Sequence, residues 1–595
     1  MTELRFMSSG QLSGFFGNLY RRTWEGNLLA LDWEGDFLGP FVSKSESSGY
    51  VGLGKTLEAL TRTAHETGEA TLLEQRRLVL DTLLGAREPD GYPGTFAPEP
   101  RYERLWDVHE MAYLILGLLA DYELHADEVS LSVARETGDL LLARLDAATL
   151  EQAGREPWGT VAPHLGLLGL DRAMVALSRV TGDERYARFA RDRLGLEAWD
   201  LGIVEGRFEP IEGHMYAYLE RALAQLELRE LDGDRGTPSA VDRAIDYLLR
   251  DRALLVSGTC SIEECWHSDQ TVTGDIGETC ATAYLIRLLW KLLRRGGAGS
   301  YGDLMERAIY NTLAAAQSPD GRRLRYYVPL EGERRYWEKD TYCCPGNFRR
   351  VVSELPNMIA VGGERELLVN LYTECALTVR IDGETVIGLT QRTDYPNSGL
   401  VDLEISPDRP VELTLCLRAP GYAPAPRVTV NGAEANAAPA PHGGRAGFIV
   451  IRREWRGGDH VRLEVEMPWR WIRGIRRQVG RSALARGPML YCFNPHRNPG
   501  IDPDAVRGGE YALDPRSIEG PLADDSLRPG GTACRVNALR KNAQRGEERV
   551  ELTLTEFSDP DGVATYFPLS DPGAAVDEEL HVTLRSSGVP EQECR

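Results

Sequence analysis

The chain contains little cysteine and no long apolar run. Its 595 residues include 10 cysteines, which lack the short repeated framework of a secreted, disulfide-rich domain. No stretch approaches the ~20 consecutive apolar residues that a membrane helix needs. The N-terminus lacks the basic segment, apolar run and small-residue cleavage site of a secretory signal. We therefore expect reduced thiols, no membrane partner and a cytoplasmic location.

Basic residues are scarce relative to acidic ones. Lys and Arg total 68 against 90 Asp and Glu, so the formal net charge is −22. This balance argues against nucleic acid as a partner, because the phosphate backbone repels an acidic protein. The apolar content of 42% is ample for a large core, and the length favours roughly two to four domains. A neutral or polar small substrate fits this composition best.

Helical periodicity covers the chain up to about residue 365. Apolar residues recur with helical spacing in paired segments at 56–68 with 71–86, 108–124 with 128–145, 167–183 with 184–195 and 214–231 with 240–250, followed by 281–296, 304–317 and 348–359. Thr-Gly-Asp/Glu triplets at 67–69, 137–139 and 181–183 are expected to end one helix and begin the next, because glycine suits the C′ position and an acid suits the N-cap. Consecutive helical hairpins predict an (α/α)6 barrel over residues 1–365. An open helical-repeat solenoid is the alternative.

After about residue 366 the apolar period becomes two. Apolar and polar residues alternate over 411–418 and 461–467, as in half-buried strands. Asn431-Gly432 is typical of a type I′ hairpin turn. Further strands are expected at 447–455, 483–493 and 549–557. We predict two β-sandwich, jelly-roll-like domains, one over 366–470 and a second, less regular one over 471–595. A homodimer through the second is compatible with the sequence, although no segment indicates it.

The cysteines are concentrated in one region that contains Cys280 and the adjacent pair Cys343-Cys344. Glu278 lies two residues before Cys280, at the expected entry of a helix. The cysteine pair is expected in a loop ahead of a helix that starts near residue 347. Three thiols and a carboxylate are a donor set for tetrahedral zinc, and two helix entrances at one mouth of a barrel would converge on one ion. A closed structural zinc site and simple buried thiols are the alternatives.

A second carboxylate candidate is Glu264, in the segment CSIEECWHS at 260–268. Glycoside hydrolysis needs an acid/base group and a nucleophile on opposite sides of the anomeric carbon. Glu264 taken alone is also compatible with a solvated acid, and its neighbour Glu263 is the alternative acid.

Three histidines, His109, His164 and His214, each lie near the N-terminal end of a predicted helix. At one mouth of a barrel they would donate hydrogen bonds to sugar hydroxyls. Tyr310 adds an aromatic ring with a polar tip, which is as compatible with a core position as with a binding role.

Taken in order, Glu264-Cys265-Trp266, Glu278-Thr279-Cys280, Tyr310-Asn311 and Cys343-Cys344-Pro345 resemble the β-L-arabinofuranosidases of glycoside hydrolase family 127. The resemblance covers the predicted barrel well and continues weakly into the strands. It implies that Glu278, Cys280, Cys343 and Cys344 bind zinc. It also implies that Cys343 is the nucleophile, that Glu264 is the general acid/base, and that His109, His214, Tyr310 and His164 contact the substrate.

The resemblance implies a retaining glycosidase that releases β-L-arabinofuranose or a related sugar from oligosaccharides through a glycosyl-thioether. Trp106 and Asp107, ahead of His109, differ from the arabinofuranosidase pattern and leave the sugar open. The alternative from another class is a non-catalytic carbohydrate-binding protein with a structural Cys3Glu zinc. A redox pair formed by the adjacent cysteines is less favoured, because no oxidoreductase cofactor motif accompanies them.

Overall fold

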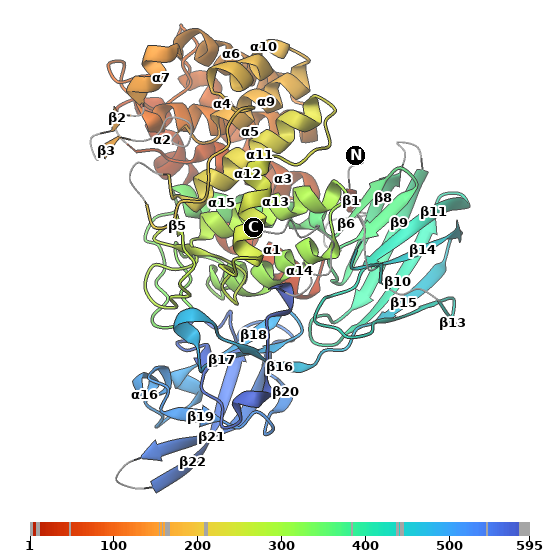
Figure 1. Cartoon of the computed structure of the whole chain (residues 1–595). Coiled ribbons are helices and arrows are strands. Elements are labelled where there is room, and N and C mark those ends of the chain that lie inside the picture. Colours follow the sequence, from red (N-terminus) through yellow and green to blue (C-terminus); the bar gives the residue numbers. More distant parts are fainter. Residues whose placement is uncertain are drawn as a thin grey trace, which may run out of the picture.

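The computed structural model describes residues 4–6, 12–46, 49–153, 155–156, 159–160, 167–207, 212–381, 385–435, 439–440, 446–542 and 546–581. A helical N-terminal part precedes two β-rich parts, which lie beside and below it in Figure 1. The predicted order of helices followed by strands is confirmed. Within the described ranges, no helix is long and apolar enough to cross a membrane.

Six largely buried helices of the described chain contact one another in a closed order. They are α3 (Leu53–Thr67), α5 (Leu105–His125), α9 (Leu170–Thr181), α11 (Met215–Leu231), α13 (Thr279–Arg294) and α15 (Cys343–Glu354). Each contacts the next, and α15 contacts α3. An open solenoid would keep its first and last helices apart.

A second set of helices packs against the first. It consists of α1 (Gly14–Arg21), α4 (Ala70–Ala86), α6 (Glu128–Arg144), α10 (Glu184–Arg188), α12 (Ser239–Leu249) and α14 (Gly299–Ala308), which contact α15, α3, α5, α9, α11 and α13 respectively. Shorter helices are α2 (Gly39–Ser43), α7 (Ala147–Ala153) and α16 (Pro503–Arg507). Eleven helices of these two sets correspond to the predicted segments, with ends that differ by several residues, whereas α1, α2, α7 and α16 were not predicted.

Two of the three predicted turns are confirmed. Gly68 and Gly182 directly follow α3 and α9 with φ of 68° and 72°, a left-handed conformation that glycine adopts without strain. Asp183 caps α10 by accepting a hydrogen bond from a backbone N–H at 3.0 Å. The prediction is wrong for the third triplet, whose Gly138 lies inside α6. Glycine serves packing there, because a Cβ would lie 2.5 Å from Cδ1 of Leu177.

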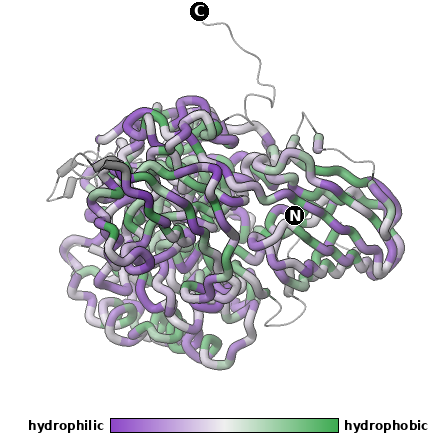
Figure 2. The backbone as a smooth tube through the Cα atoms, turned by 90° about the horizontal axis from the view of Figure 1, so that it is seen from below, coloured by the Kyte–Doolittle hydropathy of each residue, from purple (hydrophilic) through white to green (hydrophobic). Residues whose placement is uncertain are grey.

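Two sheets follow the helical part, with strand orders β1-β8-β9-β10-β15-β12-β13 and β14-β11-β7-β6. Their strands are β1 (Leu4–Phe6), β6 (Ala360–Gly363), β7 (Glu366–Val369), β8 (Cys375–Ile381), β9 (Thr385–Thr393), β10 (Leu400–Pro407), β11 (Val411–Arg418), β12 (Arg427–Val430), β13 (Ala433–Glu434), β14 (Phe448–Trp455) and β15 (Asp459–Glu464). Figure 2 shows hydrophobic and hydrophilic residues alternating along these strands. The predicted type I′ turn is confirmed, since Asn431 and Gly432 have φ of 52° and 80° between β12 and β13. Strands β1 and β6 lie outside the predicted limits of 366–470.

A nine-stranded sheet completes the described chain. Its strands are β16 (Trp469–Arg473), β17 (Ser482–Arg486), β18 (Met489–Phe493), β19 (Tyr511–Leu513), β20 (Glu519–Ala523), β21 (Thr532–Asn542), β22 (Gly546–Glu556), β23 (Tyr566–Phe567) and β24 (Ala575–Val576). The last of these, β24, returns to pair in parallel with β16. The β21–β22 hairpin extends away from the body of the molecule (Figure 1).

Candidate active site

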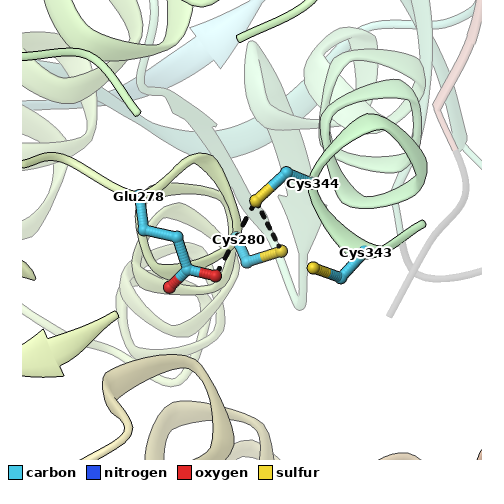
Figure 3. A group of neighbouring side chains, drawn as sticks. All are labelled: Glu278, Cys280, Cys343 and Cys344. Carbon is cyan, nitrogen blue, oxygen red and sulfur yellow. Dashed lines mark hydrogen bonds between the residues drawn. The ribbon is translucent and has the colours of Figure 1, made fainter. Parts of the chain in front are cut away.

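The starts of two buried helices bring the four predicted metal ligands together. Glu278 occupies the N-cap position of α13 and Cys280 is its second residue. Cys343 and Cys344 are the first two residues of α15, which therefore begins four residues earlier than predicted. Figure 3 shows the four side chains converging from these two helix starts. One donor atom of each lies within 4.8 Å of the others.

The cluster is dry and closely spaced. The sulfur atoms of Cys280 and Cys344 are 3.2 Å apart, and Sγ of Cys344 donates to Oε1 of Glu278 at 3.7 Å. Cys343 is 6% exposed and the other three residues are fully buried. Oε2 of Glu278 has no hydrogen-bond partner among the described residues. Three thiols and an unsatisfied buried carboxylate oxygen at this spacing fit zinc, which takes sulfur and oxygen ligands in tetrahedral sets.

Electrostatics separate Cys343 from its neighbours. Burial raises the pKa values of Glu278, Cys280 and Cys344 well above their ordinary values, because each charged form would lose its hydration. Burial acts in the same direction on Cys343. However, hydrogen bonds from the other two cysteines and the positive charge of Lys55 outweigh it and hold the pKa of Cys343 well below its usual range. The positive charge of Lys55 therefore favours negative charge on the cluster.

Glu263 and Glu264 form the turn between two very short strands, β4 (Ser261–Ile262) and β5 (Cys265–Trp266). Their φ values of 47° and 67° are those of a type I′ turn, in which asparagine and glycine are usual. A left-handed conformation costs a glutamate roughly 1–2 kcal/mol. Glu263 is exposed, whereas the Glu264 side chain is 15% exposed and reaches the cluster. This placement favours Glu264 over Glu263 as the acid.

Tyr326 joins Glu264 to the cysteine cluster. Its hydroxyl donates to Oε1 of Glu264 and lies 3.1 Å from Sγ of Cys343. Its carbonyl oxygen accepts a hydrogen bond from the N–H of Thr279 at 2.9 Å, between the two ligands that α13 supplies. Sequence reasoning missed Tyr326, because it lies in an irregular segment between 314 and 342 that has no periodic pattern to place it.

His214 lies beside Glu264. It is the N-cap of α11, and its Nδ1 accepts a hydrogen bond from the N–H of Ala217 at 3.4 Å. The proton therefore resides on Nε2, which is 3.3 Å from Oε2 of Glu264. His214, Glu264 and Glu278 form a second close group, in which one donor atom of each residue lies within 4.8 Å of the other two.

His109 lies beside a buried lysine that the sequence did not single out. Nζ of Lys55 is 3.3 Å from Nε2 of His109 and can only donate, so the histidine proton resides on Nδ1. Burial and the charge of Lys55 lower the pKa of His109 well below its usual value. Nδ1 is buried without a partner in the described part of the chain. Lys55 also packs against the first turn of α15, since a Cβ on Gly346 would lie 3.1 Å from its Cβ.

Tyr310, which was predicted to contact the substrate, lies among other aromatic rings. Tyr310 is fully buried in η5 (Ile309–Leu313), with its ring centroid 4.4 Å from that of Phe15, 5.0 Å from Phe16 and 6.2 Å from Tyr395. These contacts favour the core position that the sequence also allowed for Tyr310. His164 lies outside the described residues.

The chain matches two family models. Residues 32–357 match "Beta-L-arabinofuranosidase, GH127 catalytic domain" and residues 366–467 match "Beta-L-arabinofuranosidase, GH127 middle domain". Among curated proteins, it is 24% identical over 494 residues to the non-reducing end β-L-arabinofuranosidase of Bifidobacterium longum subsp. longum, an alignment that covers 71% of each protein.

Solved structures of similar fold cover nearly the whole chain. A GH127 β-L-arabinofuranosidase from Geobacillus stearothermophilus T6 superposes with a TM-score of 0.79 at 21% identity, covering 96% of this chain and 100% of that one. Another GH127 β-arabinofuranosidase superposes with a TM-score of 0.80 at 21% identity, covering 97% and 99%. The similarity extends through the helical part and both β-rich parts.

Proposed function

Because the chain belongs to glycoside hydrolase family 127 and is a glycosidase, we propose that it releases β-L-arabinofuranose, or a closely related sugar, from oligosaccharides with retention of configuration. The sugar is supported by the family model for the catalytic domain and by the curated relative, which is a non-reducing end β-L-arabinofuranosidase. Cys343 acts as the nucleophile and Glu264 as the acid/base in this proposal.

The observation that carries the proposal is the Tyr326 hydroxyl, which contacts both Glu264 and Cys343. Two groups that share one hydroxyl lie within about 6 Å of each other. Retaining glycosidases keep their two catalytic groups about 5–5.5 Å apart, whereas inverting enzymes need about 6.5–9.5 Å to admit a water molecule. The short span favours a covalent glycosyl-enzyme and hence retention.

The reaction would proceed in two displacements. In the first, Glu264 protonates the glycosidic oxygen, the bond from that oxygen to the anomeric carbon breaks, and sulfur of Cys343 bonds to the carbon. In the second, Glu264 removes a proton from water, the water oxygen attacks the carbon, and the carbon–sulfur bond breaks to restore the thiolate. Tyr326 orients the carboxyl and the sulfur through its hydroxyl.

Glu278, Cys280, Cys343 and Cys344 would hold one zinc ion, whose charge keeps coordinated thiols deprotonated at neutral pH. His214 would donate from Nε2 to a sugar hydroxyl or to Glu264. His109 would donate from Nδ1, which has no hydrogen-bond partner among the described residues. Tyr326 replaces the buried Tyr310 as the tyrosine at the substrate.

The architecture that would hold this site is an (α/α)6 barrel over residues 1–365, a β-sandwich over 366–470 and a second β-domain over 471–595. The closed contact order of the six buried helices supports the barrel. The seven- and four-stranded sheets support the sandwich.

Two substitutions test the catalytic assignment. Cys343→Ser and Glu264→Gln are each expected to lower kcat/KM for a β-L-arabinofuranoside by at least about 10³, because each removes a group that acts in the transition state. Cys534→Ser, in buried β21, is the control and should keep wild-type activity. Full activity in either catalytic variant would overturn the assignment. Zinc binding without turnover of any furanoside would instead support the non-catalytic alternative.

A further inference from the structure

We infer that the nine-stranded sheet and its loops, from residue 469 onward, hold the acid/base turn and the Tyr326 segment in place and so position the catalytic groups. The inference rests on the proposed roles of Glu264 and Tyr326. The two matched family models end at residue 467 and leave this part of the chain without a role.

The first contact reaches the segment that follows Glu264. Residues Arg476–Gln478 form a single 3-10 turn, η7, between β16 and β17. The guanidinium of Arg476 donates to the carbonyl oxygen of Ser268, and Nε2 of Gln478 donates to that of Gln270 at 3.0 Å. Gln478 and Gln270 are 4% and 3% exposed. These bonds fix the backbone four and six residues beyond Glu264.

The second contact grips the segment that follows Tyr326. The carboxylate of Glu331 accepts from Arg481 at 2.5 and 3.3 Å and from the N–H of Tyr566 at 3.2 Å. The Thr565 hydroxyl donates to the carbonyl of residue 330 at 2.7 Å, and the N–H of residue 332 donates to the carbonyl of residue 563 at 2.9 Å. Glu331 is 4% exposed. The nine-stranded sheet and its loops therefore hold residues 330–332 with both charged and neutral hydrogen bonds.

Backbone hydrogen bonds connect the two gripped segments to each other and to the ligands. The N–H of Glu331 donates to the carbonyl of Val272 at 2.9 Å, and the N–H of Val328 donates to that of Ile276 at 2.8 Å. The carbonyl of Tyr326 then accepts from Thr279 at the start of α13. A shift of either segment would move Tyr326 and Glu264 together.

The turn that carries Glu264 needs support from outside itself. Its strands have two residues each, and an isolated hairpin of that size is unstable. Two consecutive glutamates at positive φ persist only where the surroundings determine the backbone. Part of this support comes from the helical part, where the N–H of Met215 donates to the carbonyl of Glu264 at 2.9 Å and the N–H of Glu263 donates to that of Asp275 at 2.7 Å. The contacts of η7 and Arg481 form a clamp that adds to it by fixing the segments that follow Glu264 and Tyr326. Arg476, Gln478, Arg481 and Glu331 are positioning residues in this account.

Leaving-group dependence separates positioning from general stability. A misplaced acid harms a substrate with a poor leaving group most, because an activated phenolate departs without protonation. Full-length, zinc-loaded Arg476→Met and Glu331→Gln would be assayed on methyl and 4-nitrophenyl β-L-arabinofuranosides. We expect kcat/KM to fall about tenfold more on the methyl glycoside than on the nitrophenyl one. Glu264→Gln should likewise lose more activity on the methyl glycoside. Gln478→Leu is the third variant if either of the first two fails to fold.

Two controls are matched in kind and lie in the same sheet. Arg473→Met removes an arginine that donates to the carbonyl of Ala575. Glu556→Gln breaks the buried ion pair with Arg528, at 2.6 Å. Each control is expected to change kcat/KM by the same factor on both substrates, however much thermal stability it loses.

Each outcome has a separate meaning. Clamp variants that lose activity equally on both substrates, or only as the controls do at equal loss of stability, would overturn the inference. If Glu264→Gln itself shows no leaving-group dependence, the proposed function fails instead. If Glu264→Gln shows the dependence and the clamp variants do not, only the inference fails.

Discussion

At the residue scale, the site places a buried cation, Lys55, close to the cysteine cluster. Lys55 is fully buried, and its ammonium group lies 4.1 Å from the ring centroid of Tyr113 and donates to Tyr216 at 3.1 Å. Burial lowers its pKa, while the cysteines act in the opposite direction. A cation so placed compensates part of the negative charge that a thiolate-rich cluster would carry.

Tyr326 offers the sharpest test at this scale. Tyr326→Phe removes one hydroxyl and keeps the ring, so we expect kcat/KM to fall roughly 10–100-fold, the effect of losing a hydrogen bond to a charged group. Zinc content and thermal stability should change little. Tyr372→Phe is the control, since its buried hydroxyl donates to the carbonyl of Arg418 outside the site. A Tyr326→Phe enzyme with wild-type kinetics would show that the bridging hydroxyl has no part in catalysis.

Glu220 is expected to make the unfolding free energy of the protein depend on pH. It is 1% exposed on α11, and burial raises its pKa from 4.5 to about 7. Between these pH values the unfolded chain releases the proton and the folded chain keeps it, so the stability contributed by protonated Glu220 is lost as pH rises to about 7. Glu220→Gln cannot ionise. It is expected to raise the unfolding free energy by about 2–3 kcal/mol at pH 8 and by little at pH 5.

Glu227, on the same helix, gives the opposite control. Burial is the largest single influence and raises its pKa, but the charges of Arg172, 3.0 Å away, and Lys291, together with the hydrogen bond from Arg172, lower the pKa below 4.5. Its contribution is present at pH 5 and at pH 8 and is lost only as pH falls through the lowered pKa. Glu227→Gln should therefore destabilise the protein at both pH values. Thermal unfolding at pH 5 and pH 8 measures both variants, and an equal effect of Glu220→Gln at the two pH values would contradict the prediction.

At the scale of elements, periodic segments were predictable from the sequence and irregular ones were not. The helices carry a 3.6-residue apolar period and the strands a period of two, so their segments follow from side-chain burial alone. Cys280 was predicted at the entry of a helix and lies there. Cys343 was predicted in a loop ahead of a helix, whereas it is the first residue of α15. The position of Tyr326 could not be predicted from the sequence, because backbone hydrogen bonds to residues far away in the chain hold its segment in place. Gly138 was wrongly predicted to lie in a turn. The neighbouring residues in the sequence do not show that another helix packs against this glycine.

Gly138 also provides an element-scale prediction. A Cβ there would lie 2.5 Å from Cδ1 of Leu177 and 3.1 Å from Cε1 of Tyr186. Gly138→Ala should therefore destabilise the protein by about 1–3 kcal/mol through overpacking. Gly85→Ala, in α4 where a Cβ meets nothing within 4 Å, should be neutral or stabilising by up to about 1 kcal/mol. Thermal unfolding compares the two variants. Equal effects at both sites would show that α6 can move away from its neighbours.

At the scale of the whole molecule, the proposed catalytic groups and metal ligands come from four separate elements within one stretch of the chain. The acid turn, the start of α13, the Tyr326 segment and the start of α15 span residues 261 to 344, and the C-terminal sheet contacts the loops among them. The sequence order therefore gives little information on the final geometry. Charged contacts buried at these junctions, such as Arg307 with Glu578 at 3.1 Å, tie the last described residues to α14.

Removal of the metal would test how far the site stabilises the molecule that builds it. Zinc bound by Glu278, Cys280, Cys343 and Cys344 would join α13 to α15 across more than sixty residues. It would bind the folded chain more tightly than the unfolded one, in which the four ligands are not held together. A ligand at a hundred times its Kd adds about 2.7 kcal/mol to the unfolding free energy, so a chelator should lower Tm by at least about 2 °C. Zinc should restore the loss. Magnesium should not, because it prefers oxygen ligands. The Cys280→Ser variant should respond weakly to the chelator. If the chelator removes zinc from the wild-type protein and Tm does not change, the metal site does not stabilise the fold, and a role of the ion would be limited to catalysis.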